Sequence, residues 1–324
     1  MHDAVTRWAR TAAVLALALA PGGCSIKTMA VNTLGNALSE GTSGFATDDD
    51  PELVRDAIPF ALKTIETLID ASPTHKGLLT AACRGFTQYS YAFIQQEADY
   101  IEAQDLDRAT AMRTRAKKMY LRALGYGLRA FEVDAPGFGE RLRRDPGAAL
   151  ATTTKTQVPL LYWTADAWGA ALSIDKADSS LSVNQNVIEA LMRRAIALDE
   201  SWEMGALHDF FITWEGGRTS IGGSLDQAMR HFERAKALGR GQRVSPFVSY
   251  AEAVSVGAQH RQEFQALLNE ALAIDAAAAA PEQRLANLIA QKRARWLLSR
   301  VDELFVEQPR PDAPVLWPLI RDRD

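Results

Sequence analysis

A triplet of side chains at helical spacing recurs along this chain and limits what the chain can fold into. In each copy a bulky residue stands four positions after a small or apolar residue and three before an alanine, so all three share one helix face. The four copies are Ala116, Tyr120 and Ala123; Ile188, Met192 and Ala195; Ala228, Phe232 and Ala235; and Phe264, Leu268 and Ala271. Alanines let two helices approach closely while the bulky residue fills the groove between them, so the triplets predict packed helices.

The spacing of the triplets predicts a repeat. Their closing alanines are 72, 40 and 36 positions apart, which fits a helix-pair unit slightly longer than the tetratricopeptide period of ~34 residues, with one weak unit in the first gap. Candidate partner helices precede the triplets at 86–101, 160–172, 202–214 and 247–258. We therefore predict an all-α fold, a tetratricopeptide-like helical-repeat solenoid of antiparallel helix pairs, over residues 50–305.

Helix-boundary signals support these limits. Asp50 can cap a helix whose first turn holds Pro51. Ser224 and Gln227 have the spacing of a capping box at the start of a later helix. Four prolines after Val306 predict a proline-rich tail at 306–324, because proline cannot continue the helical array.

The N-terminus has the pattern of a lipoprotein signal. Arg7 and Arg10 precede an apolar stretch at 11–20, which is too short to span a bilayer. Small residues then connect this stretch to Cys24. A lipoprotein needs a thiol at its new N-terminus to carry a lipid, and compact residues before it. We predict a signal peptide at 1–23, lipidation of Cys24 and a flexible tether at 24–49.

Two points about export stay open. Cleavage after Ala20 by the general signal peptidase is the alternative, although Pro21 directly after the cut would hinder it. Ser25 after the cysteine favours the outer over the inner membrane for a lipoprotein that faces the periplasm.

Several kinds of chemistry lack their sequence signals. The net charge of −4 is spread along the chain, so no nucleic-acid partner is expected. The five histidines include no pair at the spacing of a zinc helix, and the Walker-like segment 217–224 has Gly223 in place of the phosphate-binding lysine. Cys83 has no disulfide partner once Cys24 is acylated. We predict no metal site, no cofactor and no catalytic residues, and therefore no enzyme.

Aromatic side chains are the one unusual concentration. Core packing explains most of them, but such clusters also line concave ligand sites. The candidate ligand-binding residues, from two predicted helices, are Tyr162, Trp163, Trp168, Trp202, His208, Phe210, Phe211 and Trp214. For His208 the alternative is a hydrogen-bonded structural histidine.

Three segments resemble one family in their order along the chain. They are 56–63 (DAIPFALK), 158–165 (VPLLYWTA) followed by Trp168, and 191–200 (LMRRAIALDE), all after the lipoprotein start. Over residues 50–275 the chain resembles the T-component (TatT) family of tripartite ATP-independent periplasmic (TRAP) transporters. These motifs are packing motifs and carry no catalytic residue.

The resemblance implies a lipid-anchored, periplasm-facing protein of degenerate tetratricopeptide-like helix pairs. It further implies a homotrimer that docks on the transporter's substrate-binding P component, with a channel or cavity in each subunit through which a small apolar or carboxylate ligand could pass. The candidate aromatic residues would line that cavity.

Two other functions stay open at this stage. The same solenoid could be an envelope or outer-membrane assembly scaffold without a solute ligand. A periplasmic hydrolase is weakly suggested by Glu203, His208, Asp209 and Glu215, which lie close together in sequence.

Overall fold

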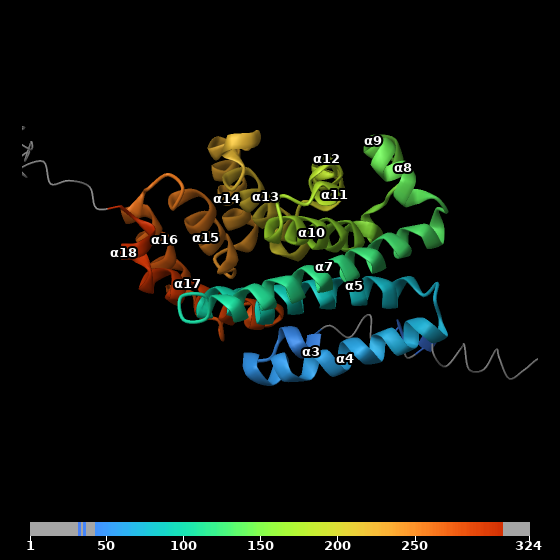
Figure 1. Cartoon of the computed structure of the whole chain (residues 1–324), viewed down its shortest axis with the longest axis horizontal. Coiled ribbons are helices and arrows are strands. Elements are labelled where there is room, and N and C mark those ends of the chain that lie inside the picture. Colours follow the sequence, from blue (N-terminus) through green and yellow to red (C-terminus); the bar gives the residue numbers. More distant parts are fainter. Residues whose placement is uncertain (1–31, 34, 37–42, 307–324) are drawn as a thin grey trace, which may run out of the picture.

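The computed structural model describes residues 32–33, 35–36 and 43–306, and this part of the chain is all helical, without strands (Figure 1). The all-α prediction is confirmed. The predicted signal peptide, the lipidation site at Cys24 and the proline-rich tail beyond Val306 lie outside the described residues.

Long helices dominate the first half of the described chain, and short ones connect them. The elements are α3 (Ser43–Ala46), α4 (Pro51–Ala71), α5 (Lys76–Ser90), the π-helical turn η1 (Tyr91–Gln95), α6 (Gln96–Ile101), α7 (Leu106–Asp134), α8 (Phe138–Arg144), α9 (Pro146–Leu150), the 3₁₀ turn η2 (Lys155–Gln157), α10 (Val158–Ile174), α11 (Ser179–Ser182) and α12 (Gln185–Asp199). Helix α10 packs against α5, α7 and α12 and so occupies the centre of this half.

Shorter helices form the second half. They are η3 (Trp202–Met204), α13 (Ala206–Gly216), η4 (Thr219–Ile221), α14 (Leu225–Gly239), α15 (Ser245–Tyr250), the π-helical turn η5 (Ala251–Ser255), α16 (Arg261–Ala273), η6 (Pro281–Gln283), α17 (Arg284–Ser299) and α18 (Val301–Leu304). Helices that follow one another in the chain pack side by side, as α13 does with α14 and α16 with α17.

Helix starts follow the predicted capping chemistry in part. The Asp50 carboxylate accepts two hydrogen bonds of 3.0 Å from amides in the first turn of α4. Ser224 caps α14 by accepting from the Gln227 amide at 3.3 Å. The reciprocal half of the predicted capping box is absent, because the Ser224 N–H donates instead to Glu215 Oε2 at 3.0 Å.

The recurring triplets form the core. All twelve side chains are buried, and none is more than 4% exposed. The triplets lie on α7, α12, α14 and α16. Their role in helix packing is therefore confirmed, while the tetratricopeptide subtype stays a prediction.

The core has two parts that meet at α13. One apolar cluster gathers side chains from α4 to α13, and a second gathers side chains from α13 to α18. Phe211 of α13 belongs to the first cluster and Ile212, its neighbour, to the second. Adjacent residues of one helix thus join the two halves.

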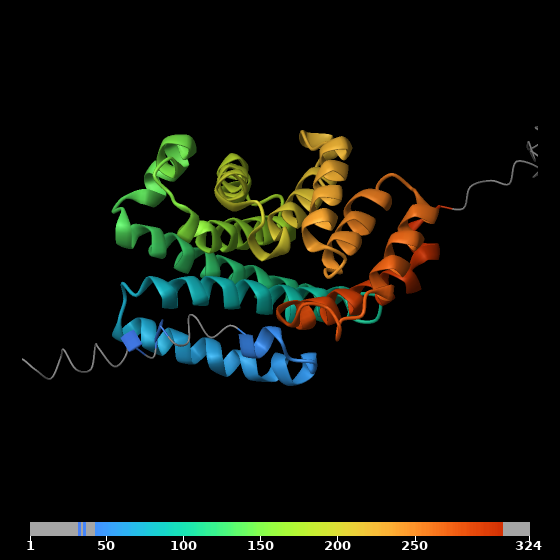
Figure 2. The ribbon, with the colours of Figure 1, turned by 180° about the vertical axis from the view of Figure 1, so that it is seen from behind.

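Ion pairs join the halves a second time, on the side away from α13. Arg293 of α17 pairs with Asp99 of α6 at 2.9 Å and with Glu252 of η5. Asp99 also pairs with Arg113 of α7 at 2.7 Å. Both views show α17 returning beside α3 and the start of α7 (Figures 1 and 2). The helical array therefore closes on itself around the region between the two apolar clusters.

Part of the predicted tether lies on this body. Asn32 Oδ1 accepts a hydrogen bond of 2.8 Å from Ser72 Oγ. Helix α3 packs on η6 and α17, and the Thr47 carbonyl accepts from Arg284 at 3.4 Å. Residues 32 and 47 of the predicted tether thus contact the helical body.

Candidate functional site

Three of the predicted ligand-binding aromatics form a cluster at one end of α10. The Tyr162 ring lies 4.7 Å from Trp163 and 4.8 Å from Trp202, centroid to centroid, and the two tryptophans are 6.4 Å apart. All three side chains are partly exposed. They therefore present an aromatic surface that a ligand can reach.

The other predicted aromatics lie deeper. Phe210 is partly exposed and stacks on Trp214 with centroids 5.4 Å apart. The remaining candidates are buried in the core: Trp168 (2% exposed), Phe211 (0%), Trp214 (7%) and His208 (5%). The structure thus brings Tyr162, Trp163, Trp202 and Phe210 to an accessible face and covers the other four.

A carboxylate shares the accessible face of α10. Asp166 follows Tyr162 by one helical turn, is partly exposed and makes no hydrogen bond or ion pair with the described residues. Burial nevertheless raises the pKa of the Asp166 carboxyl to about 7. The carboxyl is thus partly accessible to water, although neighbouring protein atoms disfavour its charged form.

Helix α5 and η1 supply the facing wall. Arg84, Gln88 and Tyr91 recur at intervals of four and three residues, so they lie on one helix face. Tyr91 exposes 49% of its surface, yet burial raises its pKa; the charge of Glu252 and, more weakly, that of Asp166 act in the same direction, and Arg293 opposes them. Arg84 has no ion pair among the described residues, and burial lowers its pKa, opposed by the charge of Glu203.

A third wall comes from α13 and the start of α15. Arg243 donates to Asp209 Oδ2 at 2.5 Å and to Ser245 Oγ at 3.0 Å. Three other polar atoms of this pair, Asp209 Oδ1 and Arg243 Nε and Nη1, are buried without a hydrogen-bond partner in the described chain. The charges of Asp209 and Arg243 both act on the Tyr162 hydroxyl, whose pKa burial raises. Unsatisfied polar atoms at this position favour a water or ligand partner.

The residues that suggested a hydrolase do not converge. His208 Nδ1 lies 2.8 Å from His231 Nδ1, while Asp209 pairs with Arg243. Glu215 accepts a hydrogen bond from the amide of Ser224, the residue that caps α14. His208, Asp209 and Glu215 have separate structural partners, and Glu203 makes no hydrogen bond or ion pair with a described residue, so the structure offers no paired acid and base among the four.

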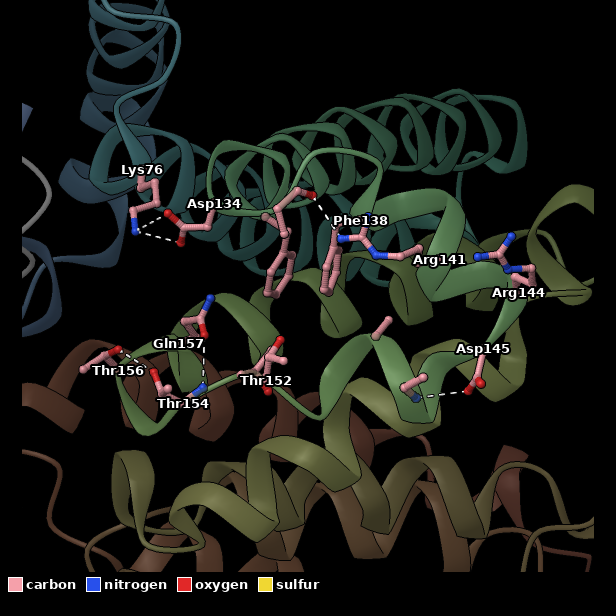
Figure 3. Close-up of a pocket in the computed structure, with 15 residues that line it drawn as sticks. Lys76, Asp134, Phe138, Arg141, Arg144, Asp145, Thr152, Thr154, Thr156 and Gln157 are labelled. Atoms are coloured by element: carbon pink, nitrogen blue, oxygen red, sulfur yellow. Dashed lines mark hydrogen bonds and ion pairs between the residues drawn. The ribbon is translucent and has the colours of Figure 1, made fainter.

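A cleft of about 600 Å³ lies apart from the aromatic cluster (Figure 3). Its walls come from the end of α7, from α8 and α9, and from the segment 151–157. None of its lining residues was among the predicted ligand-binding residues. Sequence reasoning missed it because its arginines have the pattern of a solvent-exposed helix face.

Two further properties of the described residues bear on function. No group of three or more histidine, cysteine, aspartate or glutamate side chains among them is arranged to hold a metal ion. Within the same residues, no helix has both the length and the apolar character needed to cross a bilayer.

Together the fold and the site define a class of protein: an all-helical array that carries a partly exposed cluster of aromatic side chains with charged residues near it. The chain belongs to the TRAP transporter T-component family, whose model matches residues 47–305. This confirms the family resemblance and supports association with a TRAP transporter. It is a family of transporter components and not of enzymes.

One relative extends over nearly the whole chain. It is a protein of Treponema pallidum (strain Nichols) described as uncharacterized, 29% identical over 306 residues. The match covers 88% of this chain and 94% of the relative.

Proposed function

We propose that this chain binds a small, largely apolar carboxylate in the space between α5, α10 and α13, and that it does so while docked on the P component of a TRAP transporter. In this proposal Tyr162, Trp163, Trp202 and Phe210 contact the apolar part of the ligand. Arg84 pairs with its carboxylate.

The observation that carries the proposal is the unpaired Arg84 beside an accessible aromatic cluster. Arg84 is partly buried, and a guanidinium that loses part of its hydration is less stable without a partner. The negative charge that acts on it is that of Glu203, next to Trp202. A ligand carboxylate would supply the missing hydrogen-bonded partner, and Arg suits carboxylates because its planar fork can bind both oxygens.

Asp166 supports a specific orientation of the ligand. With a pKa of about 7 the carboxyl is partly protonated at neutral pH, so it can donate or accept a hydrogen bond. The Tyr91 side chain offers a hydroxyl on the opposite wall. A polar second group on the ligand would therefore be recognised a short distance from the carboxylate.

A lipid at Cys24 would hold this binding protein at a membrane, facing the periplasm, with the outer membrane favoured by Ser25. Family membership supports the partner, and the family resemblance supports a homotrimer. Replacing Cys24 by Ser should release the chain from membranes into the soluble fraction. Unchanged membrane retention of Cys24→Ser would contradict the anchor.

Ligand binding is tested by titrating the chain with octanoate and, as a neutral match, octanamide, with tryptophan fluorescence and calorimetry as readouts. We expect octanoate to bind and to quench the tryptophan fluorescence. Arg84→Gln should weaken octanoate binding about tenfold, which is the effect of losing one charged hydrogen bond. Arg108→Gln is the matched control, because Arg108 is an exposed arginine of α7 whose side chain has no partner in the described chain.

Partner docking needs its own measurement. The tagged chain should retain the P component encoded in the same cells, and the Trp202→Ala variant should retain it equally while losing the ligand. Retention of the P component with no carboxylate binding at all would leave the scaffold function standing and reject the ligand. Loss of both would reject the proposal.

A further inference from the structure

We propose that the cleft of Figure 3 is a second binding site, which takes a small organic anion with an apolar body. Its volume of about 600 Å³ falls in the usual range for small-molecule sites. It does not depend on the proposed function, since its walls share no residue with the aromatic cluster of α10.

The floor of the cleft is apolar. Phe131 at the end of α7 and Phe138 at the start of α8 stack with ring centroids 4.4 Å apart and planes 14° from parallel. Ala149 of α9 lines the same floor and is 8% exposed. This surface would contact the body of a ligand, not its charge.

Arg144 supplies an available positive charge. Of the three cations that line the cleft, Lys76 pairs with Asp134 at 2.8 Å. Arg141 donates to the Pro136 carbonyl at 2.6 Å. Arg144, in the last turn of α8, has no hydrogen bond or ion pair with any described residue, and Figure 3 shows it at the rim. A carboxylate bound here would gain a charged hydrogen bond without breaking an existing one.

Neutral donors line the opposite wall. The Gln157 side-chain oxygen accepts from the Thr154 amide at 3.0 Å, which directs the NH₂ group of the same side chain towards the cleft (Figure 3). The Thr152 hydroxyl has no partner in the described chain. Both carboxylates of the lining are already engaged, because Asp134 pairs with Lys76 and Asp145 caps α9 through the Ala148 amide at 3.0 Å. This balance favours an anion over a cation.

The walls are fixed without a ligand. Arg194 of α12 donates to the Thr153 carbonyl at 2.6 Å and to the Ala151 carbonyl at 3.2 Å, which holds the segment 151–157 in place. On the other side, Glu132 accepts from the Gly137 amide at 2.6 Å, at a turn where Gly137 has a φ of +75°. A site whose walls are held in this way loses little entropy when it binds.

The test uses 3-phenylpropionate, with the neutral 3-phenylpropionamide as its match, on the full chain by calorimetry and saturation-transfer NMR. We expect the anion to bind with a Kd below about 1 mM and the amide at least tenfold more weakly. Ala148→Phe should abolish binding by filling the cleft, since Ala148 is exposed on its wall and takes part in the α9 cap only through its backbone N–H, which donates to Asp145.

Two arginines of α8 provide a matched pair. Arg144→Gln should weaken the anion about tenfold. Arg143→Gln should leave it unchanged, because Arg143 lies over the Trp168 ring and does not line the cleft. Equal effects of the two substitutions, or equal binding of anion and amide, would overturn the proposal. Loss of binding in Tyr162→Ala but not in Ala148→Phe would place the anion in the other site and overturn it equally.

Discussion

Replacing Asp166 by Asn should stabilise the chain, although it removes a side chain from the candidate site. The folded protein holds the pKa of this carboxyl at about 7, against an ordinary value of 3.8, because burial disfavours its charged form. Asn has nearly the same shape and no charge, so it removes this penalty and leaves the space around it unchanged.

The size and the pH window follow from the shift. A difference of about three pKa units corresponds to ~4 kcal/mol at most, and the water that reaches the partly exposed side chain reduces this, so we expect about 2 kcal/mol at pH 8. Since the folded pKa is the higher one, the unfolded chain gives up its proton first as pH rises. The free energy of unfolding therefore falls between pH 4 and about 7 and levels off above.

The assay is chemical denaturation of wild type and Asp166→Asn at pH 5 and pH 8. The difference in unfolding free energy should be larger at pH 8 than at pH 5. Asp70→Asn is the control, because Asp70 is exposed on α4 and has no ion pair or hydrogen bond in the described chain. A destabilised Asp166→Asn variant, or a difference that does not change with pH, would refute the reasoning.

Three further predictions concern packing, ion pairing and thiol reactivity. Gly127→Ala should lower the free energy of unfolding by about 2 kcal/mol, because the added Cβ would lie 2.4 Å from Thr164 Oγ1. Gly125→Ala is the control, since nothing lies within 4 Å of its added Cβ, and it should raise the free energy of unfolding by up to about 1 kcal/mol. A tolerated Gly127→Ala would contradict the close approach of α7 and α10. Arg293→Met should lower the free energy of unfolding by about 2 kcal/mol, because it leaves the carboxylates of Asp99 and Glu252 without this partner. Lys292→Ala removes an exposed ion pair and should lower it by less than about 1 kcal/mol. Equal losses for the two variants would argue against a closed array. Cys83 is 0% exposed and burial raises its pKa to about 12, so it should not react with a thiol reagent at pH 8 until the chain is unfolded.

The sequence predicted the helix-packing residues better than the site. Ala116, Tyr120 and Ala123 are wholly buried, as their spacing requires, since a helix face that is apolar at intervals of three and four must be covered. Closure of the array could not be predicted. It depends on Arg293 and Asp99, which are far apart in sequence and have the same appearance as any exposed charges of a helix surface.

The aromatic candidates show where residue type alone fails. Trp202 and Trp214 are equally large, yet one lies at an accessible cluster and the other is 7% exposed in the core. The difference in exposure depends on which face of η3 or α13 packs against a neighbouring helix. A segment that is apolar on nearly all sides does not show from its sequence which face that is.

The stronger signal was a charge where apolar residues were expected. Helix α10 is buried along most of its length, and its one acidic or basic residue is Asp166. A carboxyl in such a helix must be paired or must face water, because an unpaired charge inside a packed core is too costly. The structure gives Asp166 no partner among the described residues and leaves its side chain partly exposed, which agrees with the second alternative. A lone carboxyl on an otherwise apolar central helix is therefore a signal, absent from the sequence-based predictions, that this face of α10 reaches water.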